Sequence, residues 1–282
     1  MHGNGSLKNK LHFSAKIAVF ILMTVFSFFL LFPYLWMVST SLKRDTDVFT
    51  IPMKWIPDPV QWDNYKKVWT KIPFLLYYFN TIKVTVLSTL LQILVCSLAA
   101  YAFARLRFRF KNVIFMIFLS TMMIPWHSIM IPQFMIVSKL RLYDTHAALI
   151  LMQAFSAFGI FLLRQFFMGI PMEMSEAARI DGCSEWKIFM DIIMPLSGPG
   201  LATLCIFTFM HVWNDYLAPL IYIQTPSKQT IQLGLTAFMS ERTMEYAAIM
   251  AGTVCALFPV IVVYLLAEKY ITQGIAFSGI KN

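Results

Sequence analysis

The sequence predicts an all-α integral membrane protein with six transmembrane helices. Of its 282 residues, 59% are hydrophobic and only 13% are charged, whereas a typical soluble domain is about 45–50% apolar and about 25% charged. So few charged groups cannot cover a soluble globule, and the excess apolar residues require lipid as their solvent. Six apolar stretches approach or exceed the length of about 20 residues that a membrane helix needs.

The expected spans form one transmembrane domain over residues 17–282, after a cytosolic N-terminus at 1–16. Prolines such as Pro33, Pro125 and Pro259 interrupt them, and we interpret these as kinks, because neighbouring helices can satisfy the freed carbonyls. The six spans are about 17–40, 80–104, 113–137, 147–167, 201–223 and 247–266.

The orientation follows from basic residues in a short loop. Arg105, Arg107, Arg109 and Lys111 lie between the second and third expected spans, with no acidic residue among them. Short loops rich in Lys and Arg stay in the cytoplasm, so this loop and, with six spans, both termini are expected there. The segment 43–71 would then lie outside as a folded cap.

The net charge of +9 does not indicate a nucleic-acid partner. The basic residues lie mostly between apolar blocks, which is typical of topogenic charge and of contact with membrane lipid. The four cysteines have no CxxC spacing, and no HExxH or GxSxG pattern occurs. The sequence therefore predicts no metal site and no catalytic residues.

The polar segment between the fourth and fifth expected spans is long and patterned. The residue types predict a helix over 171–180 that ends at Gly182, and a second helix that Ser184 caps and that stops at Pro195. Acidic residues outnumber basic ones here, and the anionic inner leaflet would repel them. A protein partner on the cytoplasmic side therefore fits better than a helix pair lying on the lipid headgroups.

The second predicted helix has one apolar face. Trp186, Phe189, Met190 and Ile193 follow the i, i+3, i+4, i+7 spacing of such a face.

This segment resembles a known motif. The pattern EAA-x3-G-x9-I-x-L-P marks the EAA loop of ABC importer permeases, and it is matched by Glu176-Ala177-Ala178, Gly182 and Ile192-Ile193-Met194-Pro195, with Met194 in place of leucine. Leu98–Arg105 and Trp213–Tyr216 are similar to the carbohydrate-type branch of that family. The six-span length resembles the smaller permease of the maltose-type heterodimer.

The resemblance implies a mechanism and a set of partners. In the family, the loop supplies coupling helices that seat on ATP-hydrolysing subunits, and the substrate site alternates between outward- and inward-facing states. A second, homologous permease, two cytosolic ATP-binding subunits and an extracellular substrate-binding protein are therefore implied, in a bacterial cell membrane. The chain has no GxxxxGK[ST] phosphate loop, so ATP and Mg would be bound by the partner ATPase and no cofactor by this chain.

The resemblance also assigns residues to coupling. A charged anchor, close helix approach, the turn between helices and the exit into the fifth span are the expected roles. The residues are Glu176, Ala177, Ala178, Arg179, Asp181, Gly182, Ile192 and Pro195.

Polar residues within the spans are the candidates for the substrate pathway, because a charged side chain at the bilayer centre costs about 2.5–3.5 kcal/mol on insertion scales. We expect Trp213, Asn214, Asp215, Tyr216 and Gln153 to line it, with the two aromatic rings stacking on a sugar. The alternative is that Asn214 and Asp215 only form hydrogen bonds between helices.

The function that follows is import of a mono- or oligosaccharide by ATP-driven alternating access. One open alternative is the same importer class with glycerol phosphate, a polyamine or an amino acid as substrate. A more distant one is a secondary transporter, which would show inverted repeats with broken helices and no amphipathic insert.

Overall fold

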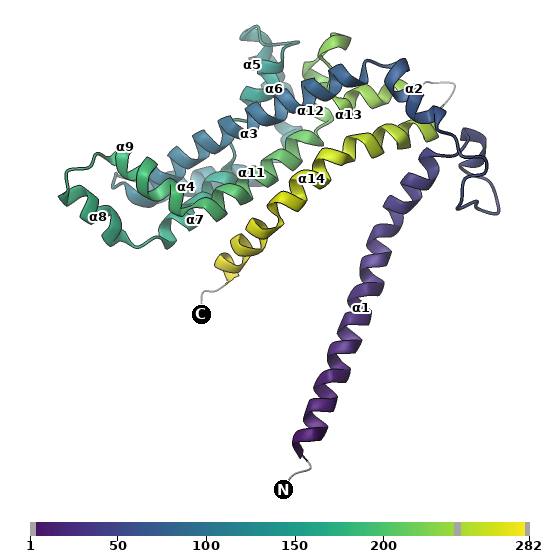
Figure 1. Cartoon of the computed structure of the whole chain (residues 1–282). Helices are drawn as coiled ribbons and strands as arrows, with labels where there is room; N and C mark the ends of the chain where they lie inside the picture. The colour runs from purple at the N-terminus through teal and green to yellow at the C-terminus, as the bar shows by residue number, and fades with distance from the viewer. Residues whose placement is uncertain (1–3, 240–243, 280–282) are drawn as a thin grey trace. The chain divides into compact units, whose positions relative to one another are not determined.

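The computed structural model describes residues 4–239 and 244–279, and the side chains of 16–239 and 244–268. Within these ranges every secondary-structure element is a helix, as the sequence predicts (Figure 1), apart from an isolated β-bridge between Met239 and Met244. The first three residues of the expected N-terminal segment 1–16 lie outside the described residues. The chain divides into two compact units, which are Met1–Lys71 with Phe238–Cys255, and Ile72–Ala237 with Ala256–Asn282.

The first unit contains a long apolar helix and a small polar fold. From residue 16 to near its end, α1 (Asn4–Ser41) exposes nearly all of its side chains, as expected of a helix whose solvent is lipid. The chain then folds around η1 (Asp45–Asp47) and α2 (Asp63–Lys71), and the buried Asn64 amide donates two hydrogen bonds to carbonyls just after α1. The segment 43–71 is thus folded, as predicted.

The second unit is built around one long central helix, α3, which packs most closely against α7 and α11 (Figure 1). In chain order its elements are α3 (Phe74–Arg105), α4 (Lys111–Ser120), η2 (Thr121–Met123), α5 (Trp126–Lys139), α6 (His146–Met152), α7 (Ala157–Gly169), α8 (Met172–Ile180), α9 (Glu185–Ile188), a π-helical turn (Phe189–Ile193), α10 (Met194–Leu196), α11 (Gly198–Trp213), α12 (Leu217–Tyr222), η4 (Pro226–Lys228) and α13 (Ile231–Gly234). The last helix, α14 (Tyr246–Gly279), begins in the first unit and continues in the second.

The three packed helices meet at a glycine of α7. A Cβ atom added at Gly159 would lie 3.0 Å from both the Cys96 Sγ of α3 and the Leu204 Cδ1 of α11. Small residues allow this kind of close approach between membrane helices. The contact fixes which faces of α3, α7 and α11 form the core.

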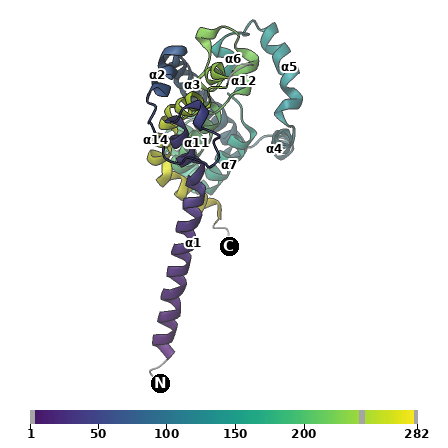
Figure 2. The same ribbon diagram turned by 90° about the vertical axis from the view of Figure 1, so that its right-hand side faces the viewer.

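Three of the expected spans are continuous helices, and Pro33 and Pro259 lie inside two of them, α1 and α14. The prediction of one kinked helix over 113–137 is wrong. α4 and α5 instead meet at a 103° bend, which Figure 2 shows from the side. Ile124 is extended there, because the ring of Pro125 disfavours a helical backbone at the preceding residue.

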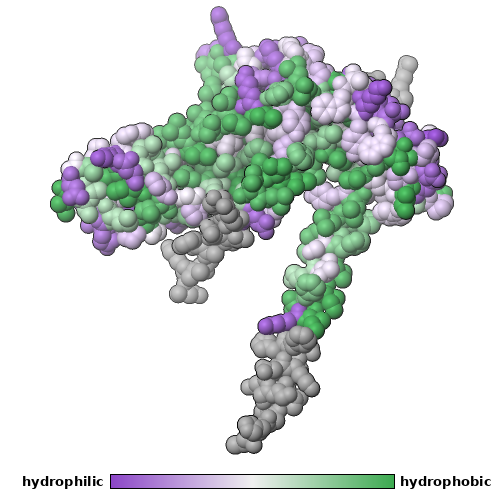
Figure 3. Space-filling model, viewed as in Figure 1, coloured by the Kyte–Doolittle hydropathy of each residue, from purple (hydrophilic) through white to green (hydrophobic). Residues whose placement is uncertain are grey.

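The other two expected spans are also interrupted. α6 and α7 are bent by 47°, and residues 214–216 separate α11 from α12. By length and composition, the described residues contain three helices that can cross a membrane, or up to six spans if each bent pair counts as one. Hydrophobic residues dominate the surface of α1 and the middle of the second unit, while hydrophilic residues gather near α8 and α9 (Figure 3).

Candidate functional site

The polar segment between α7 and α11 folds as a helix pair, as predicted. We call residues 171–195 the helix-pair segment. α8 starts after Pro171 and ends before Gly182, which has a φ of 80°, a left-handed conformation that glycine adopts without steric cost. The Ser184 hydroxyl accepts a hydrogen bond from the Lys187 N–H at 3.3 Å and so caps α9.

The apolar face predicted for the second helix is only half right. Phe189 and Ile193 are buried, but Trp186 and Met190 are 58% and 45% exposed, and Ile188 is buried instead. The cause is the π-helical turn after α9. Its wider i→i+5 spacing brings residues 188 and 193 onto one face and rotates the others out of register.

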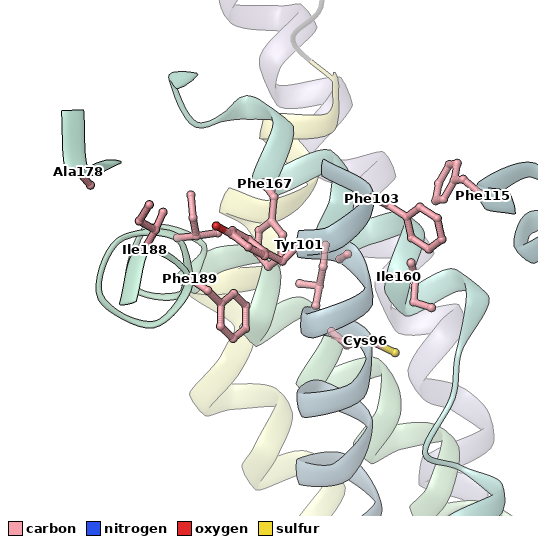
Figure 4. Close-up of a cluster of buried hydrophobic side chains, with 13 residues drawn as sticks. Cys96, Tyr101, Phe103, Phe115, Ile160, Phe167, Ala178, Ile188 and Phe189 are labelled. Atoms are coloured by element: carbon pink, nitrogen blue, oxygen red, sulfur yellow. The ribbon is translucent and has the colours of Figure 1, made fainter. Parts of the chain in front are cut away.

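One carboxylate joins three elements at this site. Glu185 of α9 accepts a hydrogen bond from the Tyr101 hydroxyl of α3 (Oη–Oε2, 2.6 Å). It also forms an ion pair with Arg179 of α8 (Nε–Oε1, 2.7 Å). The Arg179 guanidinium and then the Tyr101 hydroxyl hold the pKa of Glu185 below its usual value. Figure 4 shows Tyr101 in the cluster of buried side chains, together with Phe167 and Phe189.

Two of the four basic residues at the end of α3 and in the turn that follows are hydrogen-bonded to backbone carbonyls. Arg105 is 4% exposed, and its Nη2 donates to the carbonyls of Phe167 (2.5 Å) and Ile170 (2.6 Å) at the end of α7. Lys111 donates to two carbonyls near the end of α3. Sequence reasoning counted all four basic residues as topogenic, and it did not foresee that two of them also bind backbone carbonyls near helix ends.

Tyr101 and Glu185 were not predicted as site residues. The signal in the sequence is the i, i+4 spacing of Tyr101 and Arg105 at the end of a span, which places both on one helix face. The acidic partner 84 residues later carries no comparable signal.

The residues that the EAA resemblance assigns to coupling divide by exposure. Ala178 is buried in the core cluster (Figure 4). The second helix was expected to stop at Pro195, and α10 continues one residue past it, to Leu196. Arg179 and Ile192 are partly buried, and the exposed residues are Glu176, Ala177, Asp181, Gly182 and Pro195. The helix pair therefore presents acidic and small residues outward.

The expected pathway residues are placed in two different environments. Trp213 is 1% exposed, its Nε1 donates to the Ala256 carbonyl at 3.0 Å, and its ring stacks on Phe209. It is thus a packing residue, and its ring faces are not open to a sugar. Asn214 and Tyr216 lie exposed in the break between α11 and α12.

Asp215 and Gln153 lie together inside the bundle. The Asp215 carboxylate accepts from the Ala218 N–H at 3.2 Å and from Gln153 Nε2 at 3.5 Å. Both side chains line a cavity of about 10 Å³, which Thr85 and Thr230 also line. That volume holds about one water molecule, so the cavity is not a sugar site in this conformation. The hydrogen bonds agree with the alternative structural interpretation of Asp215.

A metal-binding role finds no support in the described residues. Within these ranges, no group of three or more His, Cys, Asp or Glu side chains lies close enough together to hold an ion.

Comparison with known proteins identifies the family. The family described as "Binding-protein-dependent transport system inner membrane component" matches residues 92–276. The chain belongs to this family. It is a membrane-embedded permease subunit of an ABC importer, a transport component and not an enzyme, and the resemblance found in the sequence is confirmed.

Relatives of this inner membrane component match over nearly its whole length. The lactose transport system permease LacG of Rhizobium radiobacter is 32% identical, with 93% of this chain and 95% of the relative covered. The sn-glycerol-3-phosphate permease UgpE of Yersinia enterocolitica is 35% identical (88% and 92%). The arabinooligosaccharide permease AraQ of Halalkalibacterium halodurans is 30% identical (91% and 93%).

A solved structure has the same fold. A chain of a bacterial ABC transporter involved in the import of the acidic polysaccharide alginate superposes with a TM-score of 0.79 at 26% identity, covering 91% of this permease and 96% of that chain.

Proposed function

We propose that this permease imports a sugar, and that its helix-pair segment at 171–195 docks on a cytosolic ATPase subunit. The observation that carries the docking proposal is the two-sided geometry of the segment. Its inner side is tied to α3 through Glu185, whereas Ala177 and Ile180 of α8 are exposed. Glu176 is also exposed, and it lines the same hollow as Glu185 and Arg107. Movement of a partner that binds the outer side is therefore transmitted to α3.

The docking surface combines acidic and apolar side chains. Ile180 and Trp186 are 86% and 58% exposed, and Glu173 and Glu176 are exposed on α8, about two turns and one turn before Ile180. Exposed large apolar residues rimmed by polar ones mark protein interaction sites. A partner with a basic rim and an apolar cleft fits this surface, and ATP and Mg would be bound on that partner.

The proposed topology has six spans with both termini in the cytoplasm. The three continuous helices, the bent pairs α4–α5 and α6–α7, and α11 with α12 provide enough apolar length for it. Arg107 and Arg109 stay exposed, and Arg107 lies beside the helix-pair segment, which supports a cytosolic position for this end of the bundle. A second permease subunit and an extracellular binding protein complete the proposed importer. A solved alginate importer complexed with an alginate-bound periplasmic protein supports the latter.

A polyhydroxylated substrate is favoured by the relatives. LacG and AraQ are transport permeases for lactose and arabinooligosaccharides. Asn214 and Tyr216 are the exposed polar and aromatic candidates for its pathway, whereas Trp213 supports them by packing and Gln153 and Asp215 by hydrogen bonding. Glycerol phosphate is the second candidate, because UgpE is 35% identical.

The docking proposal is tested by charge reversal. Glu176→Lys is expected to abolish co-purification with the ATPase subunits and to stop uptake. Asp191→Lys, a reversal at another exposed acidic residue of the same segment, serves as the matched control and should retain both. Normal association and uptake with Glu176→Lys would refute the docking proposal.

The substrate proposal is tested by uptake in cells that carry the complete transporter. Labelled lactose, arabinotriose and sn-glycerol-3-phosphate are compared, and import of a sugar is expected. Asn214→Ala should raise the half-saturating concentration, while Asn112→Ala, also exposed, should leave it unchanged. Import of glycerol phosphate alone would overturn the sugar assignment.

A further inference from the structure

Two residues near the end of α3 hold the helix-pair segment from the membrane side. Tyr101 and Arg105 are one helical turn apart and therefore lie on one face of α3. They are 5% and 4% exposed. Each reaches a different part of the chain between α7 and α11.

Tyr101 holds the second helix of the pair. Its hydroxyl donates to the Glu185 carboxylate at 2.6 Å, and its ring lies 5.2 Å from the Phe189 ring. Glu185 is held at the same time by Arg179 of α8. Hydrogen bonds to an ionised carboxylate are about twice as strong as neutral ones, so α8 and α9 are joined to α3 at one charged point.

Arg105 holds the chain just before the pair. Its two hydrogen bonds to the Phe167 and Ile170 carbonyls occupy acceptors at the end of α7, and its Nη1 lies 3.1 Å from the Met172 Sδ of α8. A cation is favoured at this position, because the C-terminus of a helix carries a partial negative charge. α3 is thus hydrogen-bonded both to the end of α7, just before the helix pair, and to α9, the second helix of the pair.

The chain that connects the helix pair to α11 is interrupted, unlike α3. It runs through the π-helical turn and then through a 78° bend into α11. A π turn and a sharp bend are points where helical hydrogen bonding is interrupted. α3, in contrast, is one unbroken helix of 32 residues.

From this contrast we infer that Tyr101 and Arg105 are positioning residues that make α3, and not α11, move with the helix-pair segment. α11 follows through a flexible joint. This inference rests on the proposed docking of an ATPase on the segment, and it adds which membrane helix receives the movement.

The test measures distances in the assembled transporter, reconstituted with its ATPase subunits and freed of native cysteines. Spin labels at Lys187 and Lys83 report α9 relative to α3, and labels at Lys187 and Phe207 report α9 relative to α11. All three positions are exposed. On addition of Mg-ATP and vanadate, we expect the first distance to stay constant and the second to change.

A variant shows whether the Tyr101 contact is the cause. Tyr101→Phe should let the first distance change as well, and it should lower uptake per ATP hydrolysed by about tenfold, as for loss of one charge-assisted hydrogen bond. Tyr77→Phe removes the same atom from the other end of α3 and should retain wild-type distances and coupling.

The outcomes separate the two ideas. A constant second distance with a changing first one, or a Tyr101→Phe variant with wild-type coupling, would overturn the role of α3 while leaving docking intact. Loss of ATPase association in Glu176→Lys tests docking independently. If ATP is hydrolysed and neither distance changes, α11 does not move relative to the helix-pair segment and the role of α3 is refuted, while docking is still judged by Glu176→Lys.

Discussion

Replacing Gly200 by alanine tests how tightly the start of α11 is packed. A Cβ atom there would lie 2.6 Å from two ring carbons of Phe166 on α7, so the ring or the helix must shift by most of an ångström to reach normal contact. Overpacking of this kind costs about 1–3 kcal/mol. The better helix propensity of alanine offsets about 0.8–1 kcal/mol of this, so we expect a net loss of up to about 2 kcal/mol.

Gly198 supplies the matched control, two residues earlier in the same turn. Nothing lies within 4 Å of a Cβ atom at this position, so Gly198→Ala has only the propensity gain of up to about 1 kcal/mol. The propensity gain is common to both variants, so reversible unfolding in mixed micelles should separate them by the overpacking cost of about 1–3 kcal/mol. The double variant Gly200→Ala/Phe166→Leu should recover part of the loss. Equal stability of the two alanine variants would refute the packing argument.

Three further predictions concern polar contacts. Asp144 accepts hydrogen bonds from the Thr225 hydroxyl, two backbone N–H groups and Lys228, which hold its pKa well below the usual range; protection of the 224–228 loop from amide exchange should therefore persist from pH 7 to about pH 4 and fade only below it, and Asp144→Asn should lower it at pH 7. Ser184→Ala removes the cap of α9 and should weaken the fold by about 1 kcal/mol, seen as faster exchange of the Lys187 amide and no change in the rest of the bundle. Trp213→Phe removes the hydrogen bond from Nε1 to the Ala256 carbonyl and should cost about 0.5–1.5 kcal/mol, with an unchanged half-saturating substrate concentration; a changed concentration would support a role for Trp213 in the substrate pathway.

Sequence reasoning succeeded where the signal is local. Gly182 and Ser184 mark the ends of α8 and α9, because a left-handed turn and a free helix N-terminus each favour particular residue types in one stretch of chain. The apolar length of the spans is likewise a property of each segment alone. The EAA spacing added the family, which the comparisons confirm.

It failed where partners are distant or the helical period changes. With the π-helical turn, Trp186 is exposed and Ile188 is buried, the reverse of the predicted apolar face. No single residue type in the sequence predicts such a turn. The hydrogen bonds of Arg105 were not foreseen, because the carbonyls that it binds lie more than 60 residues away in the sequence. The break at Pro125 was misjudged because a membrane helix tolerates proline only when its neighbours accommodate it.

The sequence by itself determined that the chain belongs in a membrane, that a patterned polar segment interrupts its spans, and that this segment matches an importer permease. Each of these depends on composition or on short-range spacing. Only the tertiary structure decided that α3 holds the segment through Tyr101 and Arg105, and that Trp213 is a buried packing residue. Those facts depend on which faces of distant helices meet, and close packing at residues such as Gly159 sets that contact.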